Sequence, residues 1–233
     1  MDENHRPRSI FRHQIGSSVN EDLLIFEEKT KAFTVSIGIS SDEKYYFINS
    51  SDHNTSEKYY FGIYEKKPEP KLIQQRKKGI IYSVNSWGGN FYMHTNEDAE
   101  DFKILISSNI ESKIWKTYIP SQSETMIGNL TFLNNWQIRS ELKNALDKIY
   151  DKNLKTNQEE EIIFTEETVY DSSVSLMQRD RNTDDIYISY STPKTPSRTF
   201  IYNLKTKEKK LVKEQIIPSG HNSNDYIVER LEC

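Results

Sequence analysis

The sequence has a single cysteine, Cys233, which excludes an internal disulfide framework. Glycine is also scarce, with 8 in 233 residues, and none lies in the glycine-rich pattern of a phosphate-binding loop. No apolar run approaches the roughly 18 residues that a membrane-spanning helix needs. We therefore expect no cofactor, no membrane partner and a reducing compartment, the cytoplasm.

Charge and the N-terminal composition exclude further classes. The formal net charge is −4 and the isoelectric point is near 5.8, so the chain lacks the basic surface that nucleic acid requires. The first residues contain no apolar stretch of signal-peptide length, which predicts no secretion signal. Neither nucleic acid nor a membrane is therefore expected as a partner.

Aromatic residues and alternating strands are what the chain has in abundance. Aromatic residues make up 12% of the sequence, against 35% hydrophobic residues in all, and they suit the half-buried faces of a sheet. Runs such as 33-FTVSIGIS-40 and 44-KYYFINSS-51 alternate apolar and polar residues between turn-forming clusters. Similar runs restart near Tyr82, Met126 and Val174, a spacing of roughly 45 to 50 residues that is typical of propeller blades.

This repeat predicts an all-β chain that forms a partial, open β-propeller of about four four-stranded blades plus remnant strands. One stretch is ambiguous, because RSELKNALDKIY (139–150) also fits a short amphipathic helix. We favour strands there, since they preserve the repeat. The expected limits are remnant strands over 1–32, blades over 33–78, 79–124, 125–169 and 170–217, and an exit strand over 218–233.

The sequence offers no catalytic motif. A serine hydrolase of the α/β class needs a G-x-S-x-G elbow, and the nearest fragment, Gly16–Asn20, lacks the second glycine. We interpret it as a turn. The histidines are scattered through turns and strands without a local partner motif: His5, His13, His53, His94 and His221. No catalytic residue is predicted.

Metal ligation is equally unsupported by the motifs. There is no H-E-x-x-H and no cysteine pair. The stretch Asp180–Asp184 mimics the first three ligand positions of a calcium loop, but Asp185 stands where glycine is required and Ser191 where the bidentate glutamate belongs. A hairpin turn is the simpler interpretation, so no metal site and no cofactor-binding residue is predicted.

Charge runs and tryptophans have structural interpretations too. The acidic runs 159–161 and 166–167 could bind a cation or a basic peptide, but solubilising strand ends are commoner. The basic groups 76–78 and 207–210 are interpreted as turns. Core packing between blades is a commoner use than ligand stacking for the tryptophans, which are Trp87, Trp115 and Trp136.

The amino-acid sequences of several segments resemble those of a known family. IFRHQIG, DLLIFEE, FTVSIGISSDEKYYFINSS, WKTYIP and DIYISYSTPKTPSRTFIYNLKTKEKKLVKEQIIPSG are similar to the β-propeller of the oligopeptidase B (protease II) branch of the prolyl oligopeptidase family. The resemblance extends from about Arg6 to Cys233. It implies a cytoplasmic serine peptidase that cleaves short peptides after Lys or Arg, with a seven-bladed propeller capping an α/β-hydrolase domain.

The family's Ser, Asp and His triad belongs to that hydrolase domain and has no counterpart in these 233 residues. We therefore expect a propeller fragment without activity of its own, ending where an absent hydrolase domain would follow. A separately encoded hydrolase fragment is the expected partner, and short basic peptides would bind only to the intact enzyme. A decayed gene product and a split subunit both remain open. So does a stand-alone propeller-like module that binds a peptide or protein.

Overall fold

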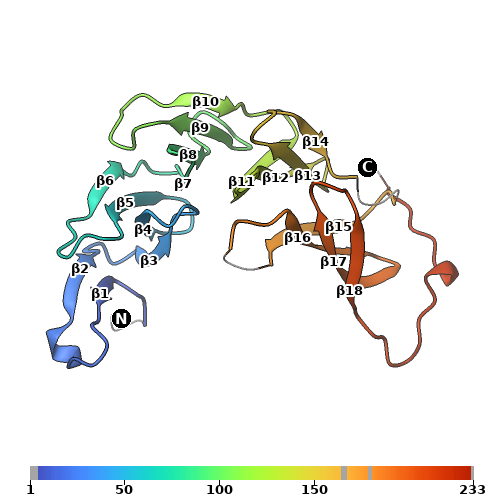
Figure 1. Ribbon diagram of the computed structural model, residues 1–233, viewed down its shortest axis with the longest axis horizontal. Coiled ribbons are helices and arrows are strands. Elements are labelled where there is room, and N and C mark those ends of the chain that lie inside the picture. Colours follow the sequence, from blue (N-terminus) through green and yellow to red (C-terminus); the bar gives the residue numbers. More distant parts are fainter. Residues whose placement is uncertain (1–4, 164–166, 178–179, 232–233) are drawn as a thin grey trace. The chain divides into compact units, whose positions relative to one another are not determined.

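The structure is a computed structural model that describes residues 5–163, 167–177 and 180–231. In these ranges it is all-β, as predicted, with four four-stranded antiparallel sheets and one two-stranded sheet (Figure 1). The chain divides into two compact units, Met1–Ser121 and Gln122–Cys233, called unit 1 and unit 2 below.

Unit 1 begins with the two-stranded sheet. Strand β1 (Ser9–Arg12) pairs antiparallel with β2 (Leu23–Glu27), and a short 3-10 helix, η1 (Val19–Glu21), lies between them. Ser18 caps this helix, because its side chain accepts a hydrogen bond from the backbone N–H of Asn20. The turn that the sequence predicts at Gly16–Asn20 is therefore confirmed.

Two four-stranded meanders complete unit 1. The first contains β3 (Thr34–Ile39), β4 (Tyr45–Ser51), β5 (Ser56–Gly62) and β6 (Lys71–Gln74). The second contains β7 (Tyr82–Trp87), β8 (Asn90–Thr95), β9 (Lys103–Ser107) and β10 (Lys116–Ile119). Gly88 and Gly89 join β7 to β8 with φ of 59° and 78°, the left-handed pair that a two-residue hairpin turn requires.

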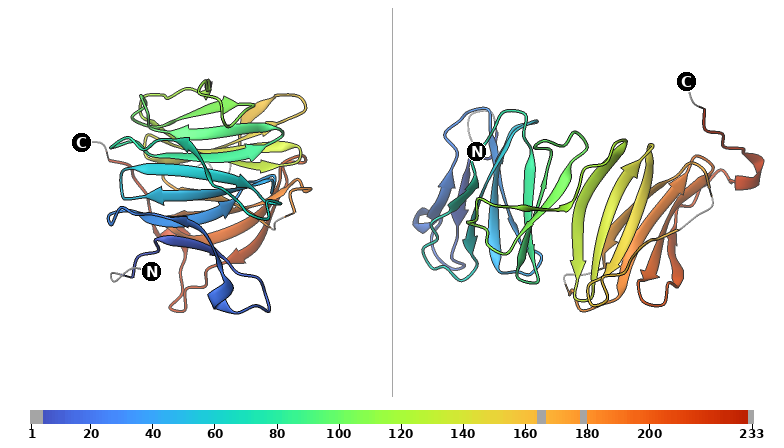
Figure 2. Two further views of the ribbon diagram at one scale, coloured as in Figure 1. Left: turned by 90° about the vertical axis from the view of Figure 1, so that its left-hand side faces the viewer. Right: turned by 90° about the horizontal axis from the view of Figure 1, so that it is seen from above.

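The core of unit 1 lies between these sheets, which Figure 2 shows stacked on one another. One cluster joins β4 and β5 to β7 and β8, and its buried members are Phe47, Tyr60, Tyr82, Val84, Phe91, Met93 and Ile110. On its other face, the β3–β6 sheet meets β2, where the rings of Tyr59 and Phe26 lie 4.7 Å apart. Both faces of this sheet are therefore packing surfaces.

Unit 2 also contains two meanders. The first has β11 (Thr125–Leu133), β12 (Trp136–Lys143), β13 (Leu146–Asn153) and β14 (Glu159–Glu161). The helix alternative for 139–150 is excluded, because β12 and β13 pair along their whole length. Asn144 and Ala145 form the turn between them with φ of 50° and 57°, which interrupts any helix.

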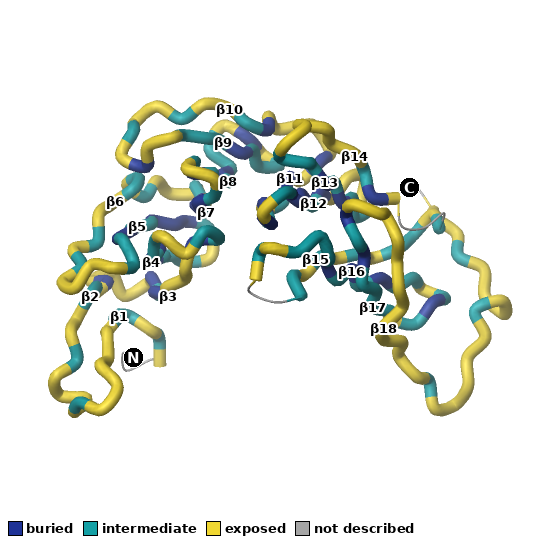
Figure 3. Tube along the Cα trace, viewed as in Figure 1, coloured by how far each residue is buried: buried dark blue, intermediate teal, exposed yellow. Residues whose placement is uncertain are grey.

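The last sheet contains β15 (Asp171–Leu176), β16 (Asp185–Thr192), β17 (Thr195–Asn203) and β18 (Lys209–Glu214). Its core with β11–β14 contains Leu133, Trp136, Ile138, Ile149, Ile162, Ile186, Ile188, Tyr202 and Leu204. Strand β18, in contrast, is exposed along its length (Figure 3). One face of this sheet thus forms the core of unit 2.

The exit strand predicted over 218–233 does not form in the described residues. Residues 218–231 contain only a 3-10 helix, η2 (Ser223–Asp225), and the last two residues lie outside the described ranges. After β18 the chain turns at Gly220, whose φ is +82° and whose N–H donates to the carbonyl of Ile217. No described strand then lies alongside to pair with this segment, so its strand-like sequence has no ladder to join. Among the described residues, no helix is long and apolar enough to cross a membrane.

Candidate functional site

His13 and His94 each make a local structural contact. The Nδ1 atom of His13 lies 2.7 Å from Oδ1 of Asp22, at an exposed hairpin. The ring of His94 stacks on Phe102 at 4.4 Å between centroids. His53 is exposed in the turn that follows β4. The sequence predicts no catalytic role for these histidines, and these contacts suggest none.

A serine does approach a histidine near the C-terminal end of the described chain. Ser223 Oγ lies 3.5 Å from His221 Nε2, but that nitrogen is 2.7 Å from the carbonyl oxygen of Lys194. A carbonyl oxygen can only accept a hydrogen bond, so Nε2 of His221 carries a hydrogen and donates the hydrogen bond to that oxygen. It cannot then act as a base toward Ser223, and His221 is exposed while Ser223 is half-buried.

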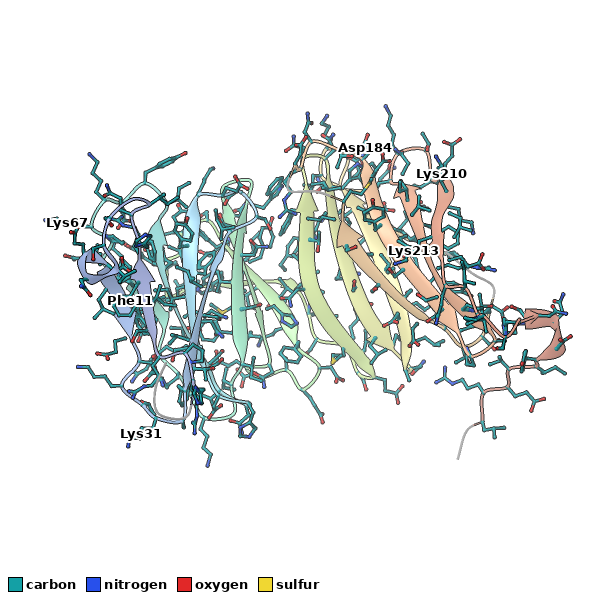
Figure 4. All side chains as sticks on the ribbon, turned by 90° about the horizontal axis from the view of Figure 1, so that it is seen from below. Phe11, Lys31, Lys67, Asp184, Lys210 and Lys213 are labelled. Carbon is teal, nitrogen blue, oxygen red and sulfur yellow. The ribbon has the colours of Figure 1, made fainter. Side chains whose placement is uncertain are left out.

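The calcium-like stretch directs its carboxylates to protein partners. Oδ1 of Asp180 accepts the backbone N–H of Asn182 at 2.8 Å, and Oδ1 of Asp184 accepts the indole N–H of Trp136 at 2.7 Å. Asp184 is labelled in Figure 4, where it lies at one end of the last sheet. Within the described ranges, no group of three or more His, Cys, Asp or Glu side chains is placed to hold a metal ion.

One polar site of unit 2 is centred on Lys207. Its ammonium lies 2.8 Å from Oδ2 of Asp151 and 2.5 Å from Oε1 of Glu160, and 5.4 Å from the centre of the Trp136 ring. We call these four residues the Lys207 cluster. Because Lys207 follows β17 and the others lie on β12, β13 and β14, this contact joins the two sheets of unit 2.

A repeated turn positions Lys207. The sequence Asn-Leu-Lys-Thr occurs at 153–156 and at 203–206, after β13 and after β17. In each copy the asparagine side chain accepts two backbone N–H groups, from residues 155 and 156 or from residues 205 and 206. The next residue has a left-handed φ, 60° for Asn157 and 62° for Lys207. The two turns thus differ mainly in the side chain that this position carries.

A pocket of about 350 Å³ opens beside the Lys207 cluster. Residues of both charge signs line it, among them Asp184, Glu160, Lys155 and Lys205, together with Trp136. Such a lining suits a small polar ligand that bears both an amine and a carboxylate. Trp136 itself is only 7% exposed, in agreement with the core role expected for it.

Burial controls the electrostatics of Asp151. This residue is 1% exposed, and its desolvation raises the pKa of the carboxyl group even though Lys207 acts in the opposite direction. The Lys207 pKa is also raised: burial lowers it, but hydrogen bonds to Asp151 and Glu160 outweigh that effect. The pair is therefore held together, while the carboxylate is costly to keep ionised.

Unit 1 has a comparable group centred on Arg76, which follows β6. The guanidinium Nη2 lies 2.7 Å from Oε2 of Glu28 and 2.6 Å from Oε2 of Glu57, and its Cζ is 4.1 Å above the ring of Phe33. We call these four residues the Arg76 cluster. Glu28 and Glu57 are 4% and 5% exposed, so two carboxylates are buried around one cation.

The Arg76 cluster keeps its carboxylates ionised. Burial, the largest single effect, acts to raise the pKa of Glu28, but hydrogen bonds from Ser50, Arg76 and Thr30 together lower it to about 2. The pKa of Glu57 is lowered in the same way, against its burial, by Arg76 and Tyr59. With this many donors, the buried charges are fully bonded, which is the condition for a stable buried ion pair.

Neither cluster is predicted from the sequence. The acidic run 159–161 is expected from the sequence to be solubilising, yet these glutamates pair in turn with Arg139, Lys207 and Lys148. The partners lie far apart in the sequence, and no local pattern marks them. The second acidic run is described only at Glu167, which lies 3.1 Å from Lys194, and Glu166 is outside the described residues.

Comparison with known proteins decides the family. Residues 1–215 match the model of the prolyl oligopeptidase N-terminal β-propeller domain. The chain belongs to the prolyl oligopeptidase family. The fold class predicted from the repeat, part of a β-propeller, is thereby confirmed, as is the predicted resemblance.

Two curated relatives illustrate the relationship. Protease 2 of Moraxella lacunata is 28% identical over 99% of this chain and 33% of its own length. Dipeptidyl aminopeptidase BI of Pseudoxanthomonas mexicana is 24% identical over 94% of this chain and 30% of its own length. The chain thus spans about a third of the length of these relatives.

Solved structures of the family show the same fold. Oligopeptidase B from Trypanosoma brucei, with covalently bound antipain, matches with a TM-score of 0.88 and 23% identity over 97% of this chain and 33% of its own. Oligopeptidase B from Leishmania major matches with a TM-score of 0.87 and 20% identity over 99% of this chain and 34% of its own. At these identities the likeness concerns the fold alone.

Proposed function

We propose that this chain is the propeller part of a serine oligopeptidase that cleaves short peptides after Lys or Arg. The observation that carries the proposal is the match of residues 1–215 to the family's propeller domain. The similarity to Protease 2 supports the oligopeptidase B branch and, with it, the preference for basic residues.

In this proposal the propeller restricts access and an α/β-hydrolase domain performs the chemistry. Peptide hydrolysis by a serine peptidase needs a nucleophile, a base and an oxyanion hole held in one geometry. None of these roles is assigned to a residue of this chain, nor is any cofactor-binding or metal-binding role. The chain would therefore act together with a hydrolase domain and would not turn over peptides alone.

The blade limits belong to the same proposal. We assign blades to 33–78, 79–124, 125–169 and 170–217, with remnant strands before them and a connecting segment over 218–233. The four four-stranded sheets each fall within one of these ranges, which supports the division. A cytoplasmic location is proposed with it, because a lone cysteine suits a reducing compartment.

The direct test is a peptidase assay with the purified chain and chromogenic peptides ending in Arg or Lys. We expect no turnover above the blank from the chain alone. Adding a purified α/β-hydrolase domain of the oligopeptidase B branch should give Arg- and Lys-selective turnover that a serine-directed inhibitor stops. Inhibitor-sensitive turnover by the 233 residues alone would overturn the division of roles.

A second candidate, a peptide-binding or protein-binding module, is favoured by one observation. The pocket beside Trp136 offers an aromatic wall and charges of both signs. Calorimetric titration with Lys- and Arg-containing dipeptides separates the two candidates. Saturable binding that Trp136→Ala abolishes, without any effect of a hydrolase domain, would favour the module.

A further inference from the structure

Lys58 lies at the packed interface between the two four-stranded sheets of unit 1. It is directly cross-strand from Asn49 of β4, and it alternates along β5 with Tyr60, a member of the core between these sheets. The backbone N–H of Lys58 donates to the phenol oxygen of Tyr82 on β7, at 2.8 Å. The Lys58 side chain therefore leaves the face of β5 that meets the β7–β10 sheet, and the residue is half-buried.

The amine of Lys58 has a neutral partner. Its Nζ donates to Oδ1 of Asn49 at 2.7 Å, and no described carboxylate forms an ion pair with it. The side-chain amide of Asn49 donates in turn to Ser51 Oγ, which directs Oδ1 toward the lysine. The hydroxyl of Tyr82 is already used, since it accepts from the Lys58 N–H and donates to the carbonyl of Gln74. One protein acceptor thus serves a group that has three N–H donors when it is charged.

Two other lysines of unit 1 have the opposite environment. Lys71 pairs with Glu111 at 2.7 Å and Lys77 pairs with Glu97, and hydrogen bonds to these carboxylates raise the pKa of both lysines. Burial without a carboxylate instead lowers the pKa of Lys58 to about 8. Near neutral pH, a larger fraction of Lys58 is therefore the neutral amine, whose lone pair is available for nucleophilic attack.

An uncharged product with a single donor suits this position better than the ammonium. Acylation turns the amine into an amide, which carries no charge and keeps one N–H. That N–H can still donate to Oδ1 of Asn49, so that burial no longer desolvates an unpaired charge. A carbamate, formed with carbon dioxide, would instead place a negative charge beside an oxygen that only accepts hydrogen bonds. The surroundings of Lys58 thus favour an acyl group over a carboxylate.

We propose that Lys58 is an acylation site, modified by a small acyl phosphate. The neutral Nζ attacks the acyl carbon, the N–C bond forms as the C–O bond to phosphate breaks, and the proton lost from nitrogen leaves with the phosphate. Amine and acyl phosphate thus give an amide and hydrogen phosphate. A half-buried amine admits a small donor of this kind. The inference does not depend on peptidase activity.

The test treats the full chain with acetyl phosphate at pH 7.5 and follows acetylation of each lysine by peptide mass spectrometry. About a quarter of Lys58 is neutral at this pH, against about one part in a thousand for a lysine with its usual pKa. Lys58 should therefore react at least about fivefold faster than Lys71 and Lys77, even though a weaker base is a poorer nucleophile. Its rate should level off above pH 8, whereas theirs should still rise at pH 10. Unfolding in guanidinium chloride should abolish the difference.

A variant tests the neutral partner. Asn49→Asp replaces the amide with a carboxylate of the same size, which should raise the pKa of Lys58 and slow its acetylation at pH 7.5 by about tenfold. The matched control is Asn90→Asp, at the end of β7 and β8 that is remote from Tyr82, and it should leave the rate unchanged. Equal acetylation of Lys58, Lys71 and Lys77 in the folded chain, or an unchanged rate in Asn49→Asp, would overturn the proposal. Amide exchange along β4 and β5 verifies that each variant is folded.

Discussion

The Arg76 cluster of unit 1 and the Lys207 cluster of unit 2 both pair carboxylates with one cation, but they do so with different side chains. In each, a cation beyond the end of a strand reaches two carboxylates and lies over an aromatic ring. Arg76 adds a hydrogen bond from its backbone N–H to Glu57, and Ser50 and Thr30 donate to Glu28. Asp151 has the ammonium of Lys207 as its charged partner.

The number of donors decides what burial does to the acids. Glu28 accepts several hydrogen bonds, and its pKa falls to about 2 in spite of burial. Asp151 is buried more deeply with fewer donors, and its pKa rises. A buried carboxylate is therefore stabilising only where donors outweigh desolvation. The Arg76 cluster should stabilise unit 1 more than the Lys207 cluster stabilises unit 2.

The largest expected effect comes from Arg76→Met. It leaves Glu28 and Glu57 buried without their cation and should lower the free energy of unfolding of unit 1 by about 4 kcal/mol. Urea unfolding in a Trp136→Phe background measures it, because the two remaining tryptophans, Trp87 and Trp115, lie in unit 1.

Lys77→Met is the matched control. Lys77 is adjacent, 61% exposed and paired with Glu97, so its loss should cost less than about 0.5 kcal/mol. Adding Glu28→Gln and Glu57→Gln to Arg76→Met should recover part of the lost stability. Equal losses in the Arg76 and Lys77 variants would show that the buried cluster has no special weight.

As the pH falls, the Glu28 contribution should destabilise unit 1, whereas the Asp151 contribution should stabilise unit 2. Glu28 has a folded pKa of about 2 against a usual 4.5, so its contribution is complete above pH 4.5 and is lost as the pH falls toward 2. The loss should approach about 3 kcal/mol for unit 1. Asp151 has a raised folded pKa, so this group favours folding of unit 2 as the pH falls.

Urea unfolding between pH 5 and pH 2 measures this contrast, with Trp136 alone reporting on unit 2 in a Trp87→Phe, Trp115→Phe background. Glu28→Gln should flatten the acid dependence of unit 1, and Asp151→Asn should remove the opposing contribution in unit 2. An unchanged acid slope in Glu28→Gln would contradict the assigned role of that carboxylate.

The sheets and their turns could be predicted from local sequence patterns. Alternation and turn residues predicted the strands of all four meanders. Repeat register correctly favoured strands over a helix at 139–150. These features depend on neighbours within a few residues, which is the range that a sequence displays directly.

The clusters and the exit segment depend on partners at a distance. Arg76 reaches Glu28 across 48 positions and Lys207 reaches Asp151 across 56. Both basic groups are interpreted as turns from the sequence, because a charge run shows its composition and not the distant carboxylates with which it pairs. Residues 218–231 were expected to form a strand, but a strand needs a neighbour, and the sequence does not say whether one is in reach.

A smaller effect is expected from Lys207→Met. It leaves Asp151 buried without its cation, but that carboxyl can take a proton and Lys207 is 36% exposed, so unit 2 should lose about 2 kcal/mol. Lys205→Met, in the same turn but exposed, is the control and should have almost no effect. Asp151→Asn should restore stability to Lys207→Met, and its failure to do so would reject the buried charge as the cause.

The smallest expected effect compares the two Asn-Leu-Lys-Thr turns themselves. Asn157 and Lys207 share a left-handed φ, 60° and 62°, and each donates its N–H to the carbonyl of the asparagine that starts its turn. Glycine accepts this conformation freely, so Asn157→Gly should change the stability of unit 2 by less than about 0.5 kcal/mol. Lys207→Gly gains the same freedom but loses Asp151 and Glu160, and should cost about 1 kcal/mol. Urea midpoints from Trp136 fluorescence measure both. Equal losses would mean that the turn conformation, and not the ion pairs between the sheets, gives Lys207 its importance.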